Sequence, residues 1–264
     1  MKWFLMIMLF VVYGCRRPAP GFDFDLFKGT AAEELASAVK NESKGRIKEI
    51  LRISKISPDI QEPKYGHTLL MLAVVNNLDK SVQILLEAGA DPNMRSADGE
   101  IDLTTPMLLA CDNIFKRQIC DLDVMKLLID HKGNVNDSVP IQFLNADFVA
   151  KKTPLLEACK SDCLDLVKLL VENGADINSY DYKDGYGPFS EAIIYDNLHI
   201  LKYLIIDKKA KIPKYCYVRQ AHNESPRQEL TVTDFLNEQK YKPNSDEYKL
   251  REEILDYLHK NNER

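Results

Sequence analysis

The sequence predicts an all-α fold, a solenoid of stacked helix–turn–helix units, and three observations support that prediction. A ten-residue pattern recurs as ILLEAGADPN (84–93), LLIDHKGNVN (127–136) and LLVENGADIN (169–178). The units that contain it recur every 34 residues or so, up to about 48, which is typical of helical repeat proteins. Within each unit the apolar residues are spaced as on one face of a helix. One such unit cannot bury its apolar face alone, so we expect the units to stack.

Each unit has recognisable helix boundaries. Four copies align, namely Thr68–Asn93, Thr105–Asn136, Thr153–Asn178 and the more degraded Gly187–Pro213. Thr is a favoured N-cap, and Pro, which the first helical position tolerates, follows the cap in the last three copies. Gly89 and Gly174 are expected to end the second helix in a left-handed conformation. Small residues would let neighbouring first helices approach closely: Ala73, Ala110, Ala158 and Ala192.

The copies resemble the ankyrin repeat family over roughly residues 36–213. The match is most specific in Thr68–Asn93 and Thr153–Asn178. The fourth position of the family's T-P-L-H motif lacks its histidine and carries Met71, Leu108, Leu156 or Ser190. The resemblance implies a protein-binding array without enzyme activity of its own, and it predicts that turn fingers project from the helices. It also implies that partners bind at the turn tips and on the concave face of the first helices.

The chain divides into four parts on this interpretation. Residues 1–14 are expected to be a signal peptide and residues 15–29 a tether that contains Pro and Gly. The array would span 30–213, with a polar cap at about 30–64 and repeats at about 65–98, 102–140, 150–183 and 184–213. Residues 214–264 would form a C-terminal helical cap, in which a loop at 215–229 precedes two helices within 231–264.

The N-terminal sequence MKWFLMIMLFVVYGC indicates export. One Lys precedes eleven apolar residues, a run too short to span a bilayer but matching a signal-peptide core. The ending VVYGC resembles the lipobox of bacterial lipoproteins, which implies that Cys15 is lipidated and that the protein is anchored to a membrane of the bacterial envelope. The alternatives are an ordinary secretory signal and an apolar start without a targeting role.

The residues that could carry chemistry do not form a recognisable site. The five His residues are scattered, and no phosphate-binding loop, dinucleotide fingerprint or zinc-protease motif is present. Cys159 and Cys163 are four apart, which would suit a metal or a disulfide, but burial as small apolar residues is the favoured interpretation. We expect no cofactor and no metal. The net charge of -5 offers no basic surface for nucleic acid.

Two groups of residues are candidates for partner binding. The concave face of the first helices would present Val75, Asn76, Asn113, Glu157, Lys160, Ser161, Ile194 and Tyr195. The long turn DSVPIQFLNADFVAKK (137–152) has apolar residues on both sides of a central NAD, which predicts a hairpin. Ile141, Phe143 and Phe148 would then form a binding finger. Alternatively, Phe143 and Phe148 fold back on the extra residues of the same repeat, around Ile114, Phe115 and Ile119, and form a separate minor core that binds nothing.

The sequence therefore predicts a non-enzymatic, membrane-anchored module that recognises another protein, and an inhibitor or immunity factor is one form of it. The alternative is a structural scaffold that holds several envelope components. A third hypothesis, an enzyme with its site in residues 215–264, is disfavoured because few acid–base groups cluster there.

Overall fold

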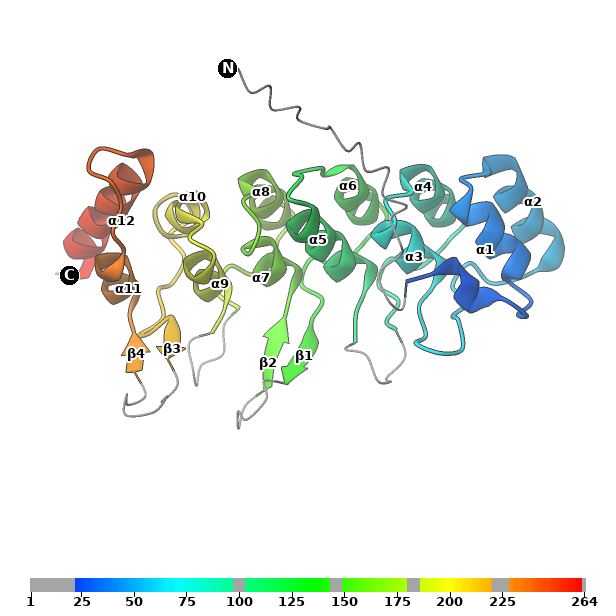
Figure 1. The fold of residues 1–264 in the computed structure, drawn as a ribbon, viewed down its shortest axis with the longest axis horizontal. Helices are drawn as coiled ribbons and strands as arrows, with labels where there is room; N and C mark the ends of the chain where they lie inside the picture. The colour runs from blue at the N-terminus through cyan, green and yellow to red at the C-terminus, as the bar shows by residue number, and fades with distance from the viewer. Residues whose placement is uncertain (1–21, 97–102, 143–148, 180–185, 220–227, 263–264) are drawn as a thin grey trace, which may run out of the picture.

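The computed structural model describes residues 22–96, 103–142, 149–179, 186–219 and 228–262. Helix pairs stack side by side into an elongated array that runs from α1 and α2 at one end to α11 and α12 at the other (Figure 1). The pairs are α1 (Glu33–Lys40) and α2 (Lys44–Ser54), α3 (Leu69–Val75) and α4 (Asp79–Glu87), α5 (Pro106–Arg117) and α6 (Asp123–Asp130), α7 (Pro154–Ala158) and α8 (Leu164–Glu172), α9 (Pro188–Ile194) and α10 (Leu198–Lys202), and α11 (Val232–Glu238) and α12 (Asp246–Asn262). A π-helical turn, Tyr203–Asp207, continues α10. We number the repeats from α1 and α2, so that α3 begins the second repeat and α9 the fifth.

The caps and turns predicted for the repeats are confirmed. The hydroxyl oxygens of Thr68, Thr105 and Thr153 accept hydrogen bonds from backbone N–H groups three residues later, at 3.2, 3.4 and 3.2 Å. These bonds satisfy donors that a helix N-terminus would otherwise leave unpaired. Gly89 and Gly174 have φ values of +91° and +89°, so both adopt the left-handed conformation expected after the second helix.

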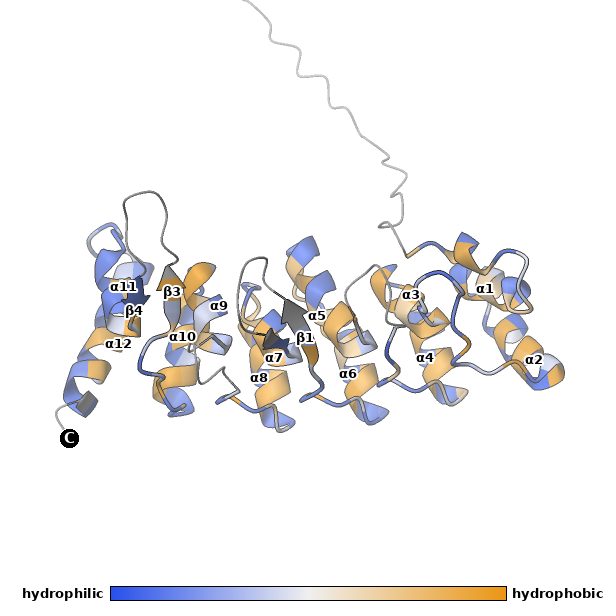
Figure 2. Cartoon of the chain, turned by 90° about the horizontal axis from the view of Figure 1, so that it is seen from below, coloured by the Kyte–Doolittle hydropathy of each residue, from blue (hydrophilic) through white to orange (hydrophobic). Residues whose placement is uncertain are grey.

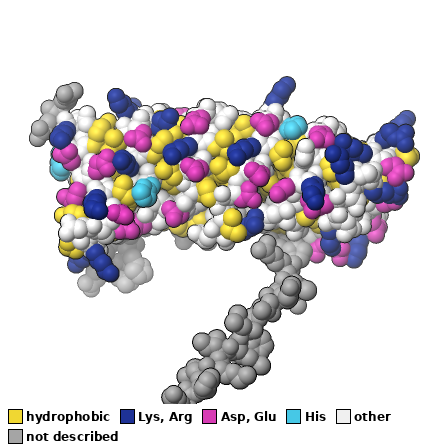
Figure 3. All heavy atoms as spheres, turned by 90° about the horizontal axis from the view of Figure 1, so that it is seen from above, with side chains coloured by type: hydrophobic (Ala, Val, Ile, Leu, Met, Phe, Trp, Pro, Cys, Tyr) yellow, Lys and Arg dark blue, Asp and Glu magenta, His cyan; other side chains and the backbone are white. Residues whose placement is uncertain are grey.

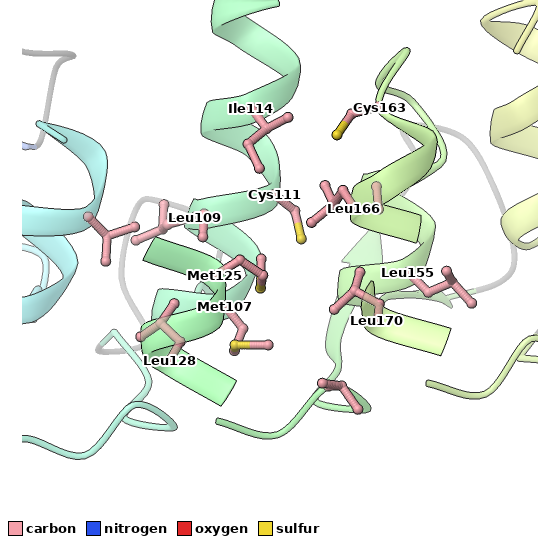
Figure 4. Close-up of a cluster of buried hydrophobic side chains, with 14 of the residues drawn as sticks. Met107, Leu109, Cys111, Ile114, Met125, Leu128, Leu155, Cys163, Leu166 and Leu170 are labelled. Carbon is pink, nitrogen blue, oxygen red and sulfur yellow. The ribbon is translucent and has the colours of Figure 1, made fainter. Parts of the chain in front are cut away.

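The buried core is formed by the repeated apolar positions. Leu85, Leu128 and Leu170, which are equivalent in the three ten-residue patterns, are fully buried. The four alanines of the first helices are also buried: Ala73, Ala110, Ala158 and Ala192. Figure 4 shows how Met107 and Met125 of one repeat face Leu166 and Leu170 of the next. In Figure 2 the apolar stretches lie on the helices, while the turns that connect them are mostly hydrophilic. Neighbouring repeats therefore share one continuous core.

Two antiparallel hairpins project from one side of the array (Figure 1). The expected hairpin is present, with β1 (Val139–Gln142) paired to β2 (Val149–Lys152) so that Val139 lies opposite Lys152. The second hairpin, β3 (Tyr217–Arg219) with β4 (Gln228–Leu230), falls where the sequence predicted a loop. Burial of Cys216 and Leu230 stabilises it, and the Cys216 N–H donates to the Leu230 carbonyl at 2.9 Å.

The tether was predicted to cover residues 15–29, but its described part, which begins at Phe22, packs on the array. Phe24–Phe27 forms a 3₁₀ turn that contacts α1, and its two phenylalanines are buried. The ring of Phe22 stacks on His67 with 4.4 Å between centroids. Three aromatic side chains therefore fix this segment to the array, although Pro and Gly precede it. Within the described residues, no helix has both the length and the apolar character needed to cross a bilayer.

Candidate protein-binding surface

The first helices α3, α5, α7 and α9 lie in sequence along the array, and each contacts the next. The residues predicted for the concave face lie at or just after the C-terminal ends of these helices, except Asn113, which lies within α5. The β1–β2 hairpin lies near the opposite ends, because β2 leads directly into the N-terminus of α7. The two groups of candidates therefore lie on different sides of the array, one near the C-terminal ends of the first helices and the other near their N-terminal ends.

The candidates in the second and third repeats hold the array together. The side-chain amide of Asn76 donates to the Leu72 carbonyl at 2.8 Å and to the Phe22 carbonyl at 3.2 Å, so the N-terminal segment covers it. Val75 beside it is half-buried. The Asn113 amide donates to the Val74 carbonyl at 3.1 Å and thereby joins two repeats. Asn76 and Asn113 therefore have structural roles.

Glu157 and Ser161 are buried, contrary to the expectation that they face solvent. Ser161 is 2% exposed, and its hydroxyl donates to the Ala158 carbonyl at 2.7 Å, which closes the turn after α7. Glu157 is 1% exposed, and the Lys160 ammonium lies 2.7 Å from its carboxylate. Helical spacing alone did not predict this burial, because it does not describe how closely the adjacent repeats pack.

Glu157 belongs to a cluster of buried charges. The Lys160 ammonium also lies 3.9 Å from the Glu191 carboxylate, and the Lys152 ammonium lies 3.8 Å from that of Glu157. The Tyr186 hydroxyl donates to the Glu191 carboxylate. Burial raises the pKa of Glu191 above its ordinary range, against the opposing effects of the Tyr186 hydrogen bond and the Lys160 charge. Burial alone would lower the pKa of Lys160, but the charge and hydrogen bond of Glu157 outweigh it and raise that pKa.

The extra residues of the third repeat lengthen its first helix. Helix α5 has 12 residues and α7 has five, so α5 extends beyond its neighbour. The ring of Phe115 on this extension packs edge-to-face on Tyr195 of the fifth repeat, with 5.1 Å between centroids. In the minor core considered as an alternative to a binding finger, Phe115 would pack on Phe143 and Phe148. Those two residues lie outside the described residues, so the choice between a finger and a minor core stays a prediction, as does the role of Ile141.

A disulfide joins the segment after α5 to the fourth repeat. Cys120 and Cys163 are bonded, with their Cα atoms 5.4 Å apart. Cys163 was expected to be a buried apolar residue or half of a pair, and the repeat pattern gave no reason to choose Cys120 as its partner. Cys111, Cys159 and Cys216 are buried thiols, and burial raises the pKa of Cys216 to about 12. Among the described residues, no three His, Cys, Asp or Glu side chains gather in a way that could hold a metal.

An open pocket of about 480 Å³ lies beside the extended end of α5, and we name it the insertion pocket. It is bounded by the end of α5, the turn after α7, the turn between α9 and α10, and the start of α12. Its wall includes Phe115, Lys160, Asp162, Tyr195, Asp196 and Glu247. Tyr195 is 42% exposed, and the adjacent Ile194 is 45% exposed. Of the residues predicted for the concave face, Lys160 and Tyr195 line the insertion pocket, and Ile194 precedes Tyr195 in the chain.

Charge on the face shown in Figure 3 is of both signs. Acidic and basic side chains are interspersed along this face, and Lys and Arg gather at the end that holds α1 and α2. The exposed basic residues of α2 are Lys44, Arg46, Lys48 and Arg52. Arg46 pairs with Glu34 and Glu49, and Lys48 pairs with Glu87 at 3.1 Å. Ion pairs therefore offset part of the basic charge at this end of the array.

The helix pairs stack on a shared core and carry projecting hairpins, and the described residues contain no recognisable catalytic constellation. These features define a repeat array of the kind that binds other proteins. Family models for ankyrin repeats match residues 65–97, 95–181 and 120–215, which together cover more than half of the chain. The chain belongs to the ankyrin repeat family. Its repeats form a protein–protein interaction module, and proteins of this family are typically non-enzymatic.

Individual relatives share part of the chain. It is 28% identical over 161 residues to the B-cell lymphoma 3 protein homolog of Mus musculus, a match that covers 61% of this chain and 32% of that protein. It is 35% identical over 107 residues to ankyrin repeat and SOCS box protein 2 of Rattus norvegicus, covering 40% of this chain and 14% of the relative. The putative ankyrin repeat protein L371 of Acanthamoeba polyphaga mimivirus is 29% identical over 140 residues, or 53% and 16% of the two chains. The chain thus spans less than a third of the length of these relatives.

Proposed function

We propose that this protein is a lipid-anchored binding module of a bacterial envelope, which recognises a partner protein through the ends of its first helices around the insertion pocket. The observation that carries the binding surface is the grouping of exposed Ile194 and Tyr195 beside the pocket. Large apolar side chains that stay exposed together often mark an interaction site.

The anchor is proposed from the sequence around Cys15 and supported by the cysteine chemistry of the array. The ending VVYGC provides a cysteine after a small residue, which matches the lipobox. The Cys120–Cys163 disulfide is consistent with an oxidising compartment, since disulfides persist in the bacterial periplasm and are rare in the cytosol. Both features agree with export, and they arise from unrelated parts of the chain.

The anchor is tested by fractionation of cells that produce the wild-type chain or Cys15→Ala. We expect the wild type in the membrane fraction, and we expect Cys15→Ala to be released or left unprocessed. A Cys15→Ala chain that is cleaved and sediments with membranes as the wild type does would disprove lipid anchoring.

The partner is tested by crosslinking in cells. A photoreactive amino acid at Tyr195 should capture one protein, whereas the same group at Glu172, exposed at the far end of α8, should capture none. Failure to capture any protein from Tyr195 would count against a partner at this surface. Capture of several different proteins along the array would favour the scaffold alternative. A toxin as the captured protein would support the inhibitor or immunity form of the proposal.

A further inference from the structure

The insertion pocket has an excess of negative charge. Four exposed carboxylates line it: Asp162, Asp196, Asp246 and Glu247. The basic side chains in the same wall are Lys160, which is paired with Glu157 and lies near Glu191, and His199. Asp246 pairs with Lys249 at 3.1 Å, but no basic side chain in the described ranges forms an ion pair with Asp162 or Glu247. The pocket therefore attracts cations.

Helix dipoles explain only part of this arrangement. Asp162 and Asp196 lie just before α8 and α10, and Asp246 and Glu247 lie in the first turn of α12. Carboxylates at these places are stabilised by the helix N-termini, each equivalent to about half a positive charge. Three such ends amount to less than the charge of four carboxylates. Asp196 also accepts a hydrogen bond from the Tyr241 hydroxyl, and Asp246 pairs with Lys249, so Asp162 and Glu247 contribute most of the remaining negative charge. The pocket beside them is large enough for a peptide side chain and its backbone.

The pocket also offers an aromatic wall. Phe115 and Tyr195 meet edge-to-face at 5.1 Å, and Tyr195 remains 42% exposed. A planar guanidinium can stack on such a ring while its N–H groups reach carboxylates, which a compact ammonium does less well. Leu250 of α12, which also lines the pocket, offers apolar surface for the methylene groups of the same side chain.

We infer that the insertion pocket receives an arginine-bearing segment of the partner protein. This inference rests on the proposed protein-binding function and specifies the chemistry of its partner. Nucleic acids and anionic lipid surfaces do not fit the pocket, because their phosphates would meet the exposed carboxylates.

The test uses the full chain in detergent with methyl-labelled isoleucine, titrated with the peptide acetyl-Gly-Arg-Gly-amide. We expect the Ile194 methyl signal to shift, while the signal of Ile53, which is exposed at the other end of the array, stays in place. The matched peptide acetyl-Gly-citrulline-Gly-amide has nearly the same shape without the charge. It should bind about tenfold more weakly or worse, because the carboxylates then face a neutral group.

Two sets of substitutions locate the effect. Asp162→Asn, Asp196→Asn and Glu247→Gln together should weaken arginine-peptide binding by about tenfold. The control set, Asp130→Asn, Glu172→Gln and Asp207→Asn, removes the same charge at the far ends of second helices and should change binding by less than about twofold. Tyr195→Leu should weaken binding, and Tyr195→Phe should retain it.

Three results would overturn the inference: an unshifted Ile194 signal, equal binding of the citrulline peptide, or equal weakening by both sets of substitutions. The crosslinking experiment separates this failure from failure of the proposed function. If Tyr195 captures a partner and the chain with the three pocket substitutions captures it equally well, the protein binds a partner without an arginine in the pocket.

Discussion

The N-terminal and C-terminal repeats differ at one buried position of the first helix. The residue just before the small alanine is Leu72 or Leu109 in the second and third repeats, and Glu157 or Glu191 in the fourth and fifth. All four are buried, at 0%, 6%, 1% and 4% exposure. The position before the small alanine can therefore hold either a leucine in apolar surroundings or a glutamate with a lysine nearby. The repeat requires that this position be filled, and a nearby cation makes a charge tolerable there.

The largest effect is expected from breaking the charged version of this position. Glu157→Ala should lower the free energy of unfolding by about 3–5 kcal/mol, because it leaves the largely buried Lys160 without its closest partner. Urea unfolding measures the change. The double substitution Glu157→Leu with Lys160→Met, which imitates the apolar version, should lose much less. An unfolding midpoint that Glu157→Ala leaves unchanged would show that the pair does not stabilise the fold.

The shared core should respond alike in both halves. Leu85→Ala and Leu170→Ala each remove a fully buried side chain at equivalent positions, so each should cost about 2–5 kcal/mol. Thermal and urea unfolding would both report the loss. A large loss for one leucine and none for the other would mean that the repeats do not share equivalent packing.

Removal of the disulfide should lower the free energy of unfolding only when the wild-type protein used for comparison is oxidised. Cys120→Ser should cost about 2–4 kcal/mol, because the bond joins residues 43 apart and restricts the unfolded chain. Reductant supplies the control, since the wild type with reductant and Cys120→Ser should unfold alike. A further loss when reductant is added to Cys120→Ser would assign the effect to another cysteine.

Removal of the helix caps should have a smaller effect, again equal in the two halves. Thr105→Ala and Thr153→Ala each lose one hydrogen bond to a helix N-terminus and should cost about 1 kcal/mol. Ser37→Ala, on the exposed side of α1, is the control and should change stability by less than about 0.5 kcal/mol. If the control and the cap variants share one urea midpoint, the caps do not contribute as expected.

The stability of the protein should depend on pH through the fifth repeat, where Glu191 is buried before the small alanine. The pKa of Glu191 is raised above 4.5, so the folded protein binds this proton more readily than the unfolded chain. Its contribution to stability is therefore present at low pH and is lost as pH rises from about the ordinary value through the raised pKa. Glu191→Gln should remove this part of the pH profile, and an identical profile would show that another group causes it.

The repeated features of the fold could be predicted from sequence, and the unrepeated contacts could not. Thr caps, Gly89 and Gly174 and the buried leucines follow from local patterns that recur in the copies. The Cys120–Cys163 bond and the Phe115–Tyr195 contact depend on how far α5 extends over its neighbours. The spacing of the repeats does not predict that length.

The candidate site is built largely from these unrepeated contacts, so sequence reasoning placed few of its residues. Lys160, Ile194 and Tyr195 were expected on this surface and lie at or beside the insertion pocket. Glu157 and Ser161 were expected there too and are buried, because their environment depends on the adjacent repeat. The contribution of α12 to the wall could not be predicted, since it depends on how α12 packs against α10.

The contact between Phe115 and Tyr195 changes how the array should come apart. Repeat proteins are commonly described as one-dimensional chains in which each unit senses only its immediate neighbours. Here the third repeat touches the fifth, and a covalent bond ties it to the fourth. Unfolding that starts at the C-terminal helices would therefore reach the third, fourth and fifth repeats, which should unfold together. In amide exchange, residues from α5 to α10 would then share one opening free energy, while α1 to α4 form a separate and more gradual series.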